Sequence, residues 1–189
     1  MATAKLLTNG YGNDTRVRTT RVRLSFPNLF EKDKTTGKYG AVLLIPKDDE
    51  SCVAVINEAI EAATQDGKER IWGGKIPRGL RSPLTNGDDS DYEGYAGCWA
   101  INAKSSKRID VYDIGKDSGT IDDPEDIYPG CYVQAIIEFY PYDNQGKGVS
   151  VILEGIKKVA EGERLGGGGY TAGADDFDDD GDEDDDLGL

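Results

Sequence analysis

The sequence predicts a mainly β protein, folded as a five-stranded, OB-fold-like antiparallel barrel with one helix between its early strands. Segments rich in β-branched and aromatic residues recur between residues 16 and 160 and are separated by turns that contain Gly, Pro or Asn. Only residues 52–67 repeat apolar side chains at helical intervals. A small curved barrel or sandwich is the usual solution for five or six strands with one helix, and the five-stranded barrel is the most economical choice.

The first predicted strand covers residues 16–26, where polar and apolar side chains alternate. One face is expected to carry Arg18, Thr20, Val22, Leu24 and Phe26, and the other Val17, Thr19, Arg21, Arg23 and Ser25. Pro27 is expected to end this strand. The continuous apolar run at 38–46 predicts a second strand that is buried on both faces.

One helix is predicted after the capping residues 48–51. Its apolar positions, spaced by three and four residues up to Gly67, are Cys52, Ile56, Ala59, Ile60 and Ala63. Residues 68–95 are rich in Gly, Pro, Asp and Asn and predict a long connection, a kind that is usually functional or mobile.

The later strands are predicted at 96–104, 109–113, 129–140 and 147–159, with a hairpin turn at 143–146. The longest of them alternates strictly. Its expected core stripe is Cys131, Val133, Ala135, Ile137 and Phe139.

The domain organisation follows from where the charges and glycines lie. We expect a flexible N-terminus at 1–15, one OB-like domain at 16–165, and a Gly-rich linker with a disordered acidic tail at 166–189. The net charge is −14, yet all 22 Lys and Arg precede residue 165, and ten acidic residues fall within 175–189. Without these ten, 26 acidic residues face 22 basic ones, so the body is close to balanced and an anionic partner is not excluded.

Composition argues against most catalytic chemistry. The chain has no histidine, which removes the commonest general base and metal ligand. Cys52, Cys98 and Cys131 form no C-x-x-C pair and fit buried, reduced side chains. Neither an apolar run of membrane-spanning length nor a signal-peptide core occurs, so we expect a cytoplasmic protein. From the missing histidine and the cysteine spacing we expect that it is not an enzyme and needs no cofactor or metal. A loose cation site at Asp88, Asp89 and Asp91 lacks the spacing of a calcium loop.

Basic and aromatic residues are interleaved along the body, as a single-stranded nucleic acid site requires. Lysine and arginine neutralise phosphates, and aromatic rings stack on unpaired bases. The candidate DNA-binding residues are Arg21, Arg23, Arg78, Arg81, Tyr95, Trp99, Lys104, Lys107, Arg108, Tyr112, Tyr132 and Tyr140.

Each of these candidates also has a structural interpretation. Trp99 lies in an apolar strand and fits a core position, while Tyr132 and Tyr140 fit cross-strand packing. The basic strand at 16–23 fits a solvated face or an edge protected from aggregation. The sequence leaves these alternatives open, and it also leaves a homodimer open.

The acidic tail combines a charge run with apolar residues. Acidic runs commonly serve solubility alone. However, a tether at about millimolar effective concentration would let this polyanion compete with DNA for a basic groove. A partner protein could bury its apolar residues, and the predicted partner-binding residues are Phe177, Asp184, Asp185, Asp186, Leu187 and Leu189.

Several ordered blocks carry a family resemblance. They are Ser25–Phe30, Lys38–Lys47, Pro83–Asp88, Tyr95–Lys104, Tyr128–Tyr132 and Lys158–Gly167. Together they resemble the single-stranded DNA-binding proteins of tailed phages, from about residue 16 to residue 180. The resemblance implies an OB-fold that coats single-stranded DNA in phage replication or recombination, with a tail that docks on replication proteins. Many bacterial relatives end in Pro-Phe, whereas this chain ends in Leu-Gly-Leu, so the docked partner is not specified.

Two other functions remain open at the level of sequence. The barrel could be a scaffold in an interaction or structural module of a phage complex that does not bind DNA. It could also belong to a strand-annealing recombination protein, which would pair complementary strands beyond coating them.

Overall fold

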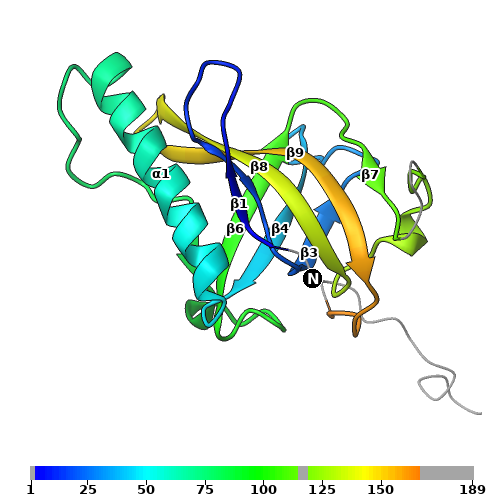
Figure 1. The fold of residues 1–189 in the computed structure, drawn as a ribbon. Coiled ribbons are helices and arrows are strands. Elements are labelled where there is room, and N and C mark those ends of the chain that lie inside the picture. Colours follow the sequence, from blue (N-terminus) through cyan, green and yellow to red (C-terminus); the bar gives the residue numbers. More distant parts are fainter. Residues whose placement is uncertain (1–2, 115–118, 167–189) are drawn as a thin grey trace, which may run out of the picture.

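The computed structural model describes residues 3–114 and 119–166 (Figure 1). Its one α-helix, α1, spans Glu50–Arg70, and two 3₁₀ turns, η1 and η2, span Gly87–Asp89 and Pro124–Asp126. The strands are β1 (Lys5–Leu7), β2 (Arg16–Arg18), β3 (Val22–Asn28), β4 (Tyr39–Pro46), β5 (Leu84–Asn86), β6 (Cys98–Ser105), β7 (Val111–Tyr112), β8 (Tyr132–Asp143) and β9 (Lys147–Ala160).

Five of these strands close a barrel in the order β3-β4-β6-β9-β8 and back to β3. All neighbours are antiparallel except β6 and β9, which meet in parallel at Lys104 and Ile152. The helix lies between the second and third barrel strands. The prediction of a five-stranded OB-like barrel with one helix between early strands is therefore confirmed.

The barrel interior is filled as the alternating pattern of β8 predicts. Val133, Ala135, Ile137 and Phe139 are at most 1% exposed. Predicted burial of β4 on both faces is also found, because Leu43 and Ile45 enter the main core while Leu44 enters a second, smaller apolar cluster on the opposite face. That second cluster lies outside the barrel and matters for the site below.

Helix α1 begins at the predicted place. The Asp49 carboxylate caps it by accepting a hydrogen bond from the Cys52 N–H at 3.2 Å. The helix does not end at Gly67 but continues to Arg70. Gly67 is needed for close packing, because a Cβ there would lie 2.7 Å from both Pro141 and Trp72. In Figure 1 the helix runs along one side of the barrel, next to β1 and β8.

The predicted strand at 16–26 is two strands, β2 and β3. Both pair with β8, but residues 19–21 between them are irregular, and the inward side changes from Val17 in β2 to Val22 and Leu24 in β3. The single alternating face expected from the sequence is thus wrong at this point. Pro27 also lies within β3 and does not end it.

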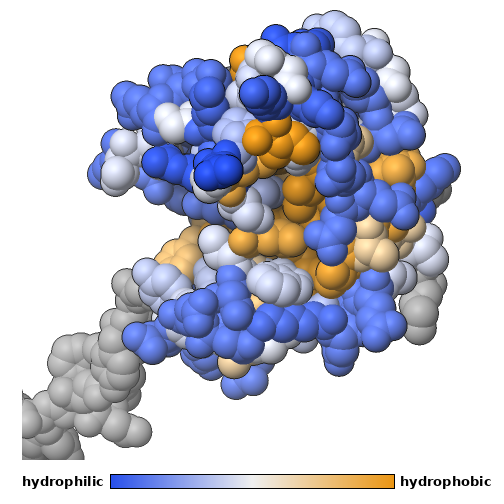
Figure 2. All heavy atoms as spheres, turned by 90° about the vertical axis from the view of Figure 1, so that its left-hand side faces the viewer, coloured by the Kyte–Doolittle hydropathy of each residue, from blue (hydrophilic) through white to orange (hydrophobic). Residues whose placement is uncertain are grey.

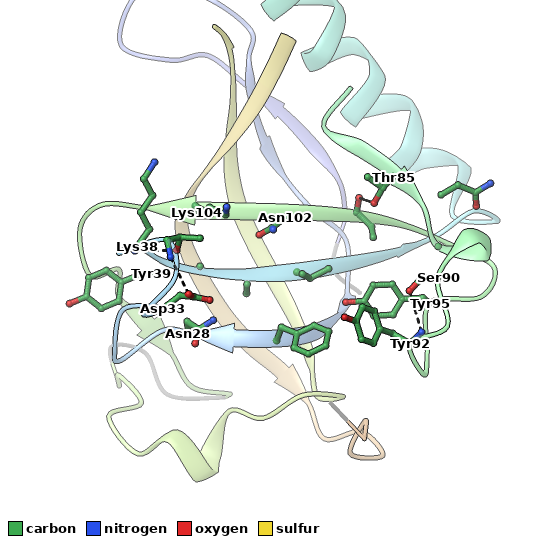
Figure 3. Close-up of a pocket in the computed structure, with 18 of the residues that line it drawn as sticks. Asn28, Asp33, Lys38, Tyr39, Thr85, Ser90, Tyr92, Tyr95, Asn102 and Lys104 are labelled. Carbon is green, nitrogen blue, oxygen red and sulfur yellow. Dashed lines mark hydrogen bonds between the residues drawn. The ribbon is translucent and has the colours of Figure 1, made fainter. Parts of the chain in front are cut away.

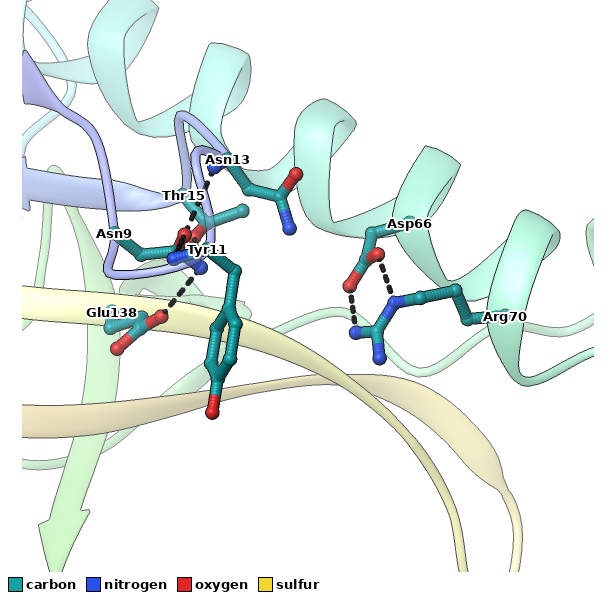
Figure 4. A network of polar contacts seen from close by, with 7 residues as sticks. All are labelled: Asn9, Tyr11, Asn13, Thr15, Asp66, Arg70 and Glu138. Carbon is teal, nitrogen blue, oxygen red and sulfur yellow. Dashed lines mark hydrogen bonds and ion pairs between the residues drawn. The ribbon is translucent and has the colours of Figure 1, made fainter.

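Part of the segment predicted to be flexible, residues 1–15, belongs to the sheet, since β1 pairs with β2. Figure 4 shows Asn9 and Thr15 close to Glu138 of β8. The Asn9 amide donates to the Thr15 hydroxyl at 3.2 Å and to the Glu138 carboxylate at 3.1 Å. These contacts fix a stretch whose composition alone suggests mobility.

The surface on the α1 side is mostly hydrophilic, with apolar side chains gathered in a recess between hydrophilic parts (Figure 2). Across residues 3–114 and 119–166, no helix has the length and apolar character needed to cross a bilayer.

Candidate nucleic-acid interface

A groove crosses the outer face of β3, β4 and β6. Pairing in register aligns Ser25, Val42 and Asn102 in one row, and Gly40 with Lys104 in a later row. A hollow of about 640 Å³ lies over this face, lined by Gly40, Val42 and Asn102 among others (Figure 3). Gly40 allows β4 and β6 to approach closely, because a Cβ there would lie 2.6 Å from the Ala103 carbonyl oxygen. In an OB barrel, this face of the second and third strands is the one that binds oligonucleotides.

One end of this groove is basic. Lys38, Tyr39 and Lys104 lie together there with one carboxylate, Asp33, beside Asn28 and Asn102 (Figure 3). We call Lys38 and Lys104 the basic end. Within the described part of the chain neither lysine takes part in an ion pair, so both ammonium groups are available to an anion.

A second hollow of about 520 Å³ extends the basic end. It shares Lys38, Asn102 and Lys104 with the groove and adds Lys107 and Tyr140. Three residues that the sequence analysis nominated, Lys104, Lys107 and Tyr140, therefore line one continuous path.

The opposite end of the groove is aromatic. Tyr92 is 60% exposed, and its ring centroid lies 4.9 Å from that of Phe26 and 5.4 Å from that of Tyr95. We call Phe26 and Tyr92 the aromatic end. The large exposed fraction of the Tyr92 ring leaves room for a base to stack on it.

Tyr95, a predicted DNA-binding residue, supports this end from below. It is 5% exposed and packs with Leu44, Ala100 and Leu165 in the second apolar cluster. Its hydroxyl donates to the Ser25 hydroxyl at 3.0 Å. Burial raises the pKa of Tyr95, so the phenol remains protonated at neutral pH and keeps this hydrogen bond.

Phe26 reaches the groove through a β-bulge. The register of β3 against β4 shifts between Ser25 and Asn28. Phe26 has a φ of 43°, a backbone angle that residues other than Gly rarely adopt. The shift breaks the alternation that would have placed Phe26 in the core beside Leu24. Its ring instead lines the groove, so a strained residue lies at the candidate site.

Trp99 points toward the barrel interior, where it packs against the main core, and the Lys47 ammonium lies 4.9 Å from its ring centroid. It lines neither hollow.

Arg21, Arg23 and Tyr132 form a separate cluster. The Arg21 guanidinium lies 4.1 Å from the Tyr132 ring centroid. Arg23 donates to the carbonyl oxygens of Gly130 at 3.2 Å and Glu163 at 2.6 Å, so it holds the C-terminal segment on the barrel. These residues line neither the groove nor its extension.

The remaining predicted residues are dispersed over other parts of the surface. Arg108 pairs with Asp122 at 3.3 Å, and Tyr112 is 41% exposed on β7. Arg78 is exposed, and Arg81 lies against the β8–β9 hairpin, where its N–H donates to the Lys147 carbonyl at 3.0 Å. The predicted tail residues Phe177, Asp184, Asp185, Asp186, Leu187 and Leu189 lie outside the described residues.

Sequence reasoning did not nominate Phe26, Lys38, Tyr39 or Asn102, and it counted Tyr92 among the interleaved aromatic residues without choosing it as a candidate. A signal existed for Asn102, because it lies two residues before Lys104 on the same strand and so faces the same side. Phe26 and Tyr92 had no such signal, since a bulge and a long loop place them.

The comparisons with known proteins show the family of the chain. A family model described as "Enterobacter phage Enc34, ssDNA-binding protein" matches residues 15–187. The chain belongs to this family of phage single-stranded DNA-binding proteins. A relative from Acyrthosiphon pisum secondary endosymbiont phage 1, called putative protein p50, is 36% identical over 173 residues, which cover 87% of this chain and 93% of the relative.

Solved structures of phage single-stranded DNA-binding proteins have the same fold. The single-stranded DNA-binding protein of bacteriophage Enc34 matches with a TM-score of 0.68 and 26% identity, over 88% of this chain and 96% of that one. Its complex with single-stranded DNA matches with a TM-score of 0.67 and 25% identity, over 85% and 98%. The single-stranded DNA-binding protein of bacteriophage T7, at a TM-score of 0.57 and 17% identity over 89% and 96%, shares the fold. All three solved structures are of proteins named as single-stranded DNA-binding proteins.

Proposed function

We propose that this chain is a non-enzymatic, sequence-tolerant single-stranded DNA-binding protein that coats and protects single strands in phage replication or recombination. The groove across β3, β4 and β6 carries this proposal, because it joins an aromatic end to a basic end. Stacking contributes about 1–3 kcal/mol per base whatever the base, and lysines neutralise phosphates without reading sequence. The Enc34 protein, whose complex with single-stranded DNA has the same fold, supports this assignment.

The geometry suggests how a strand would lie. Bases would stack at Tyr92 and Phe26, while phosphates would approach Lys38, Lys104 and Lys107. Because the bases of a duplex are already stacked and paired, such rings favour unpaired strands.

We further propose that the acidic tail competes with DNA for this groove and recruits replication or recombination proteins in the host cytoplasm. Its starting point supports competition: the Gly166 N–H donates to the Glu93 carboxylate at 3.1 Å, and Leu165 packs with Tyr95 beneath the aromatic end. Asp175 lies nine positions after Gly166, a span of at most about 30 Å. The acidic run therefore begins within about 30 Å of the aromatic end of the groove in the same molecule.

A gel-shift comparison tests the proposal. Full-length protein and residues 1–169, which retain every described strand and helix, are titrated with oligo(dT) and with duplex of equal length. We expect binding to single strands only, tighter binding by residues 1–169, and a log-log salt slope of about −0.7 per phosphate contacted. Absence of binding to oligo(dT) at low salt by residues 1–169 would refute the function. Equal affinity of the two proteins would refute tail competition alone.

A further inference from the structure

We propose that Asp88 is a positioning residue for base stacking, which holds the Tyr92 ring at the mouth of the groove. The inference rests on the proposed function and adds a residue that would not touch DNA. It concerns the segment from Gly87 to Gly97, which we call the aromatic loop because it carries Tyr92 and Tyr95.

The Asp88 carboxylate joins both ends of the aromatic loop to the barrel. One oxygen accepts the Gly97 N–H at 2.7 Å, and the other accepts the Lys47 ammonium at 2.5 Å. Lys47 directly follows β4 and also donates to the Asn86 side-chain oxygen at 2.6 Å. A single carboxylate thus closes the loop on itself and fixes it to β4.

Charge keeps this arrangement intact at neutral pH. The hydrogen bond from Gly97 and the Lys47 ammonium lower the pKa of Asp88, so the carboxylate is ionised. The Lys47 ammonium is in turn occupied by Asp88 and Asn86 and lies over Trp99, which makes it a structural cation and not a phosphate contact.

The loop held in this way presents an exposed ring on a fixed base. The Tyr92 N–H donates to the Ser90 hydroxyl, its carbonyl accepts from the Tyr95 N–H, and its ring contacts Phe26 and Tyr95. Tyr95 is fixed to the sheet through Ser25, and Asp88 fixes the ends of the loop. A ring ordered before binding loses less conformational entropy when a base stacks on it.

Substituting Asp88 separates this role from simple electrostatics by the sign of its effect. Asp88→Asn removes a negative charge near the groove, so electrostatics alone predicts tighter binding of DNA. Positioning predicts weaker binding, because a neutral amide holds the Lys47 ammonium less well and the loop loosens. Asp89 is the matched control: it lines the groove one residue later, and no side-chain hydrogen bond or ion pair holds it within the described residues. Asp89→Asn should therefore tighten binding.

The experiment measures oligo(dT) affinity of full-length variants by fluorescence anisotropy at one low salt concentration. We expect Asp88→Asn to weaken binding by about five-fold, the factor that corresponds to about 1 kcal/mol of lost stacking. Tyr92→Ala should weaken it at least as much. In the Tyr92→Ala background, Asp88→Asn should cause no further weakening, since no ring is left to position.

A second variant and a second readout separate positioning from general destabilisation. Asp88→Glu keeps the charge but displaces the carboxylate, and we expect it to weaken binding as well. Amide hydrogen exchange in Asp88→Asn should rise within residues 87–97 and stay unchanged in β8.

Tighter binding by Asp88→Asn, or equal further weakening in the Tyr92→Ala background, would overturn the inference. The proposed function fails separately, if the unmodified chain does not bind oligo(dT). If Tyr92→Ala binds oligo(dT) with the affinity of the wild type, Tyr92 is not a stacking ring and this inference is overturned. The proposal that the chain binds DNA would still stand.

Discussion

Neutralising the basic end gives the most direct test of the groove. The perturbation is the double substitution Lys38→Gln and Lys104→Gln, which removes two ammonium groups that line both hollows. Lys38 is exposed and Lys104 half-buried on the sheet surface, so glutamine can replace either without leaving a buried group unpaired.

The expected magnitude follows from counterion release. Each phosphate contact on a single strand contributes about 0.7 to the slope of log affinity against log salt, so at 0.1 M salt one lost contact costs about five-fold and two cost about 25-fold. The slope itself should fall in magnitude by about 1.4. Anisotropy titrations with oligo(dT) at several salt concentrations measure both quantities.

The matched control carries the same change in net charge away from the groove. Lys5 and Lys75 are exposed and line neither hollow, so Lys5→Gln with Lys75→Gln should leave the slope unchanged. If both double variants show the same slope and affinity, the lysines act only through net charge and the groove is not the phosphate path.

Three further predictions concern residues around the barrel. Arg23→Ala should lower the free energy of unfolding in urea by about 2 kcal/mol, because two carbonyls lose their donor, and should leave the salt slope unchanged. Trp99→Phe should lower the unfolding free energy by about 1 kcal/mol but leave oligo(dT) affinity unchanged, since the ring packs on the core; a loss of affinity without a loss of stability would contradict this placement. Burial and the Glu154 carboxylate raise the pKa of Glu138. The folded state therefore binds the Glu138 proton more tightly than the unfolded chain does, and the ionised carboxylate lowers the free energy of unfolding at neutral pH. Glu138→Gln should therefore raise the unfolding free energy at pH 7 by about 0.5 kcal/mol, a gain that disappears as the pH falls through the raised pKa; urea unfolding at pH 7 and pH 4 checks this.

The elements that could be predicted are those whose signal is local. The alternation in β8 and the spacing of Cys52, Ile56 and Ala59 in α1 reflect which side of a strand or helix meets the core, and neighbouring residues carry that information. The ordered sequence blocks likewise sufficed to indicate the family. The sequence analysis could nominate Lys104, Lys107 and Tyr140, which line the extension of the groove, because charge and aromatic content on β6, in the turn after it and on β8 are visible in the sequence.

The rest depended on contacts between distant segments. Tyr92 and Tyr95 look alike in sequence, yet Tyr95 is buried against Leu44 and Leu165 while Tyr92 is exposed, because the aromatic loop folds back over β4 and β6. The bulge at Phe26 depends on the register of β3 against β4 and reverses the face expected from alternation.

The sequence by itself determined the strand and helix content, the segregation of acidic residues beyond the body, and the absence of histidine chemistry. Each of these is a property of composition or of short-range periodicity. Only the tertiary structure decided which basic and aromatic residues share one surface. The tertiary structure brings Phe26, Lys38, Tyr92 and Lys104 to one groove and packs Trp99 against the main core. Strand register and loop path, which depend on long-range pairing, determine where each of these side chains points.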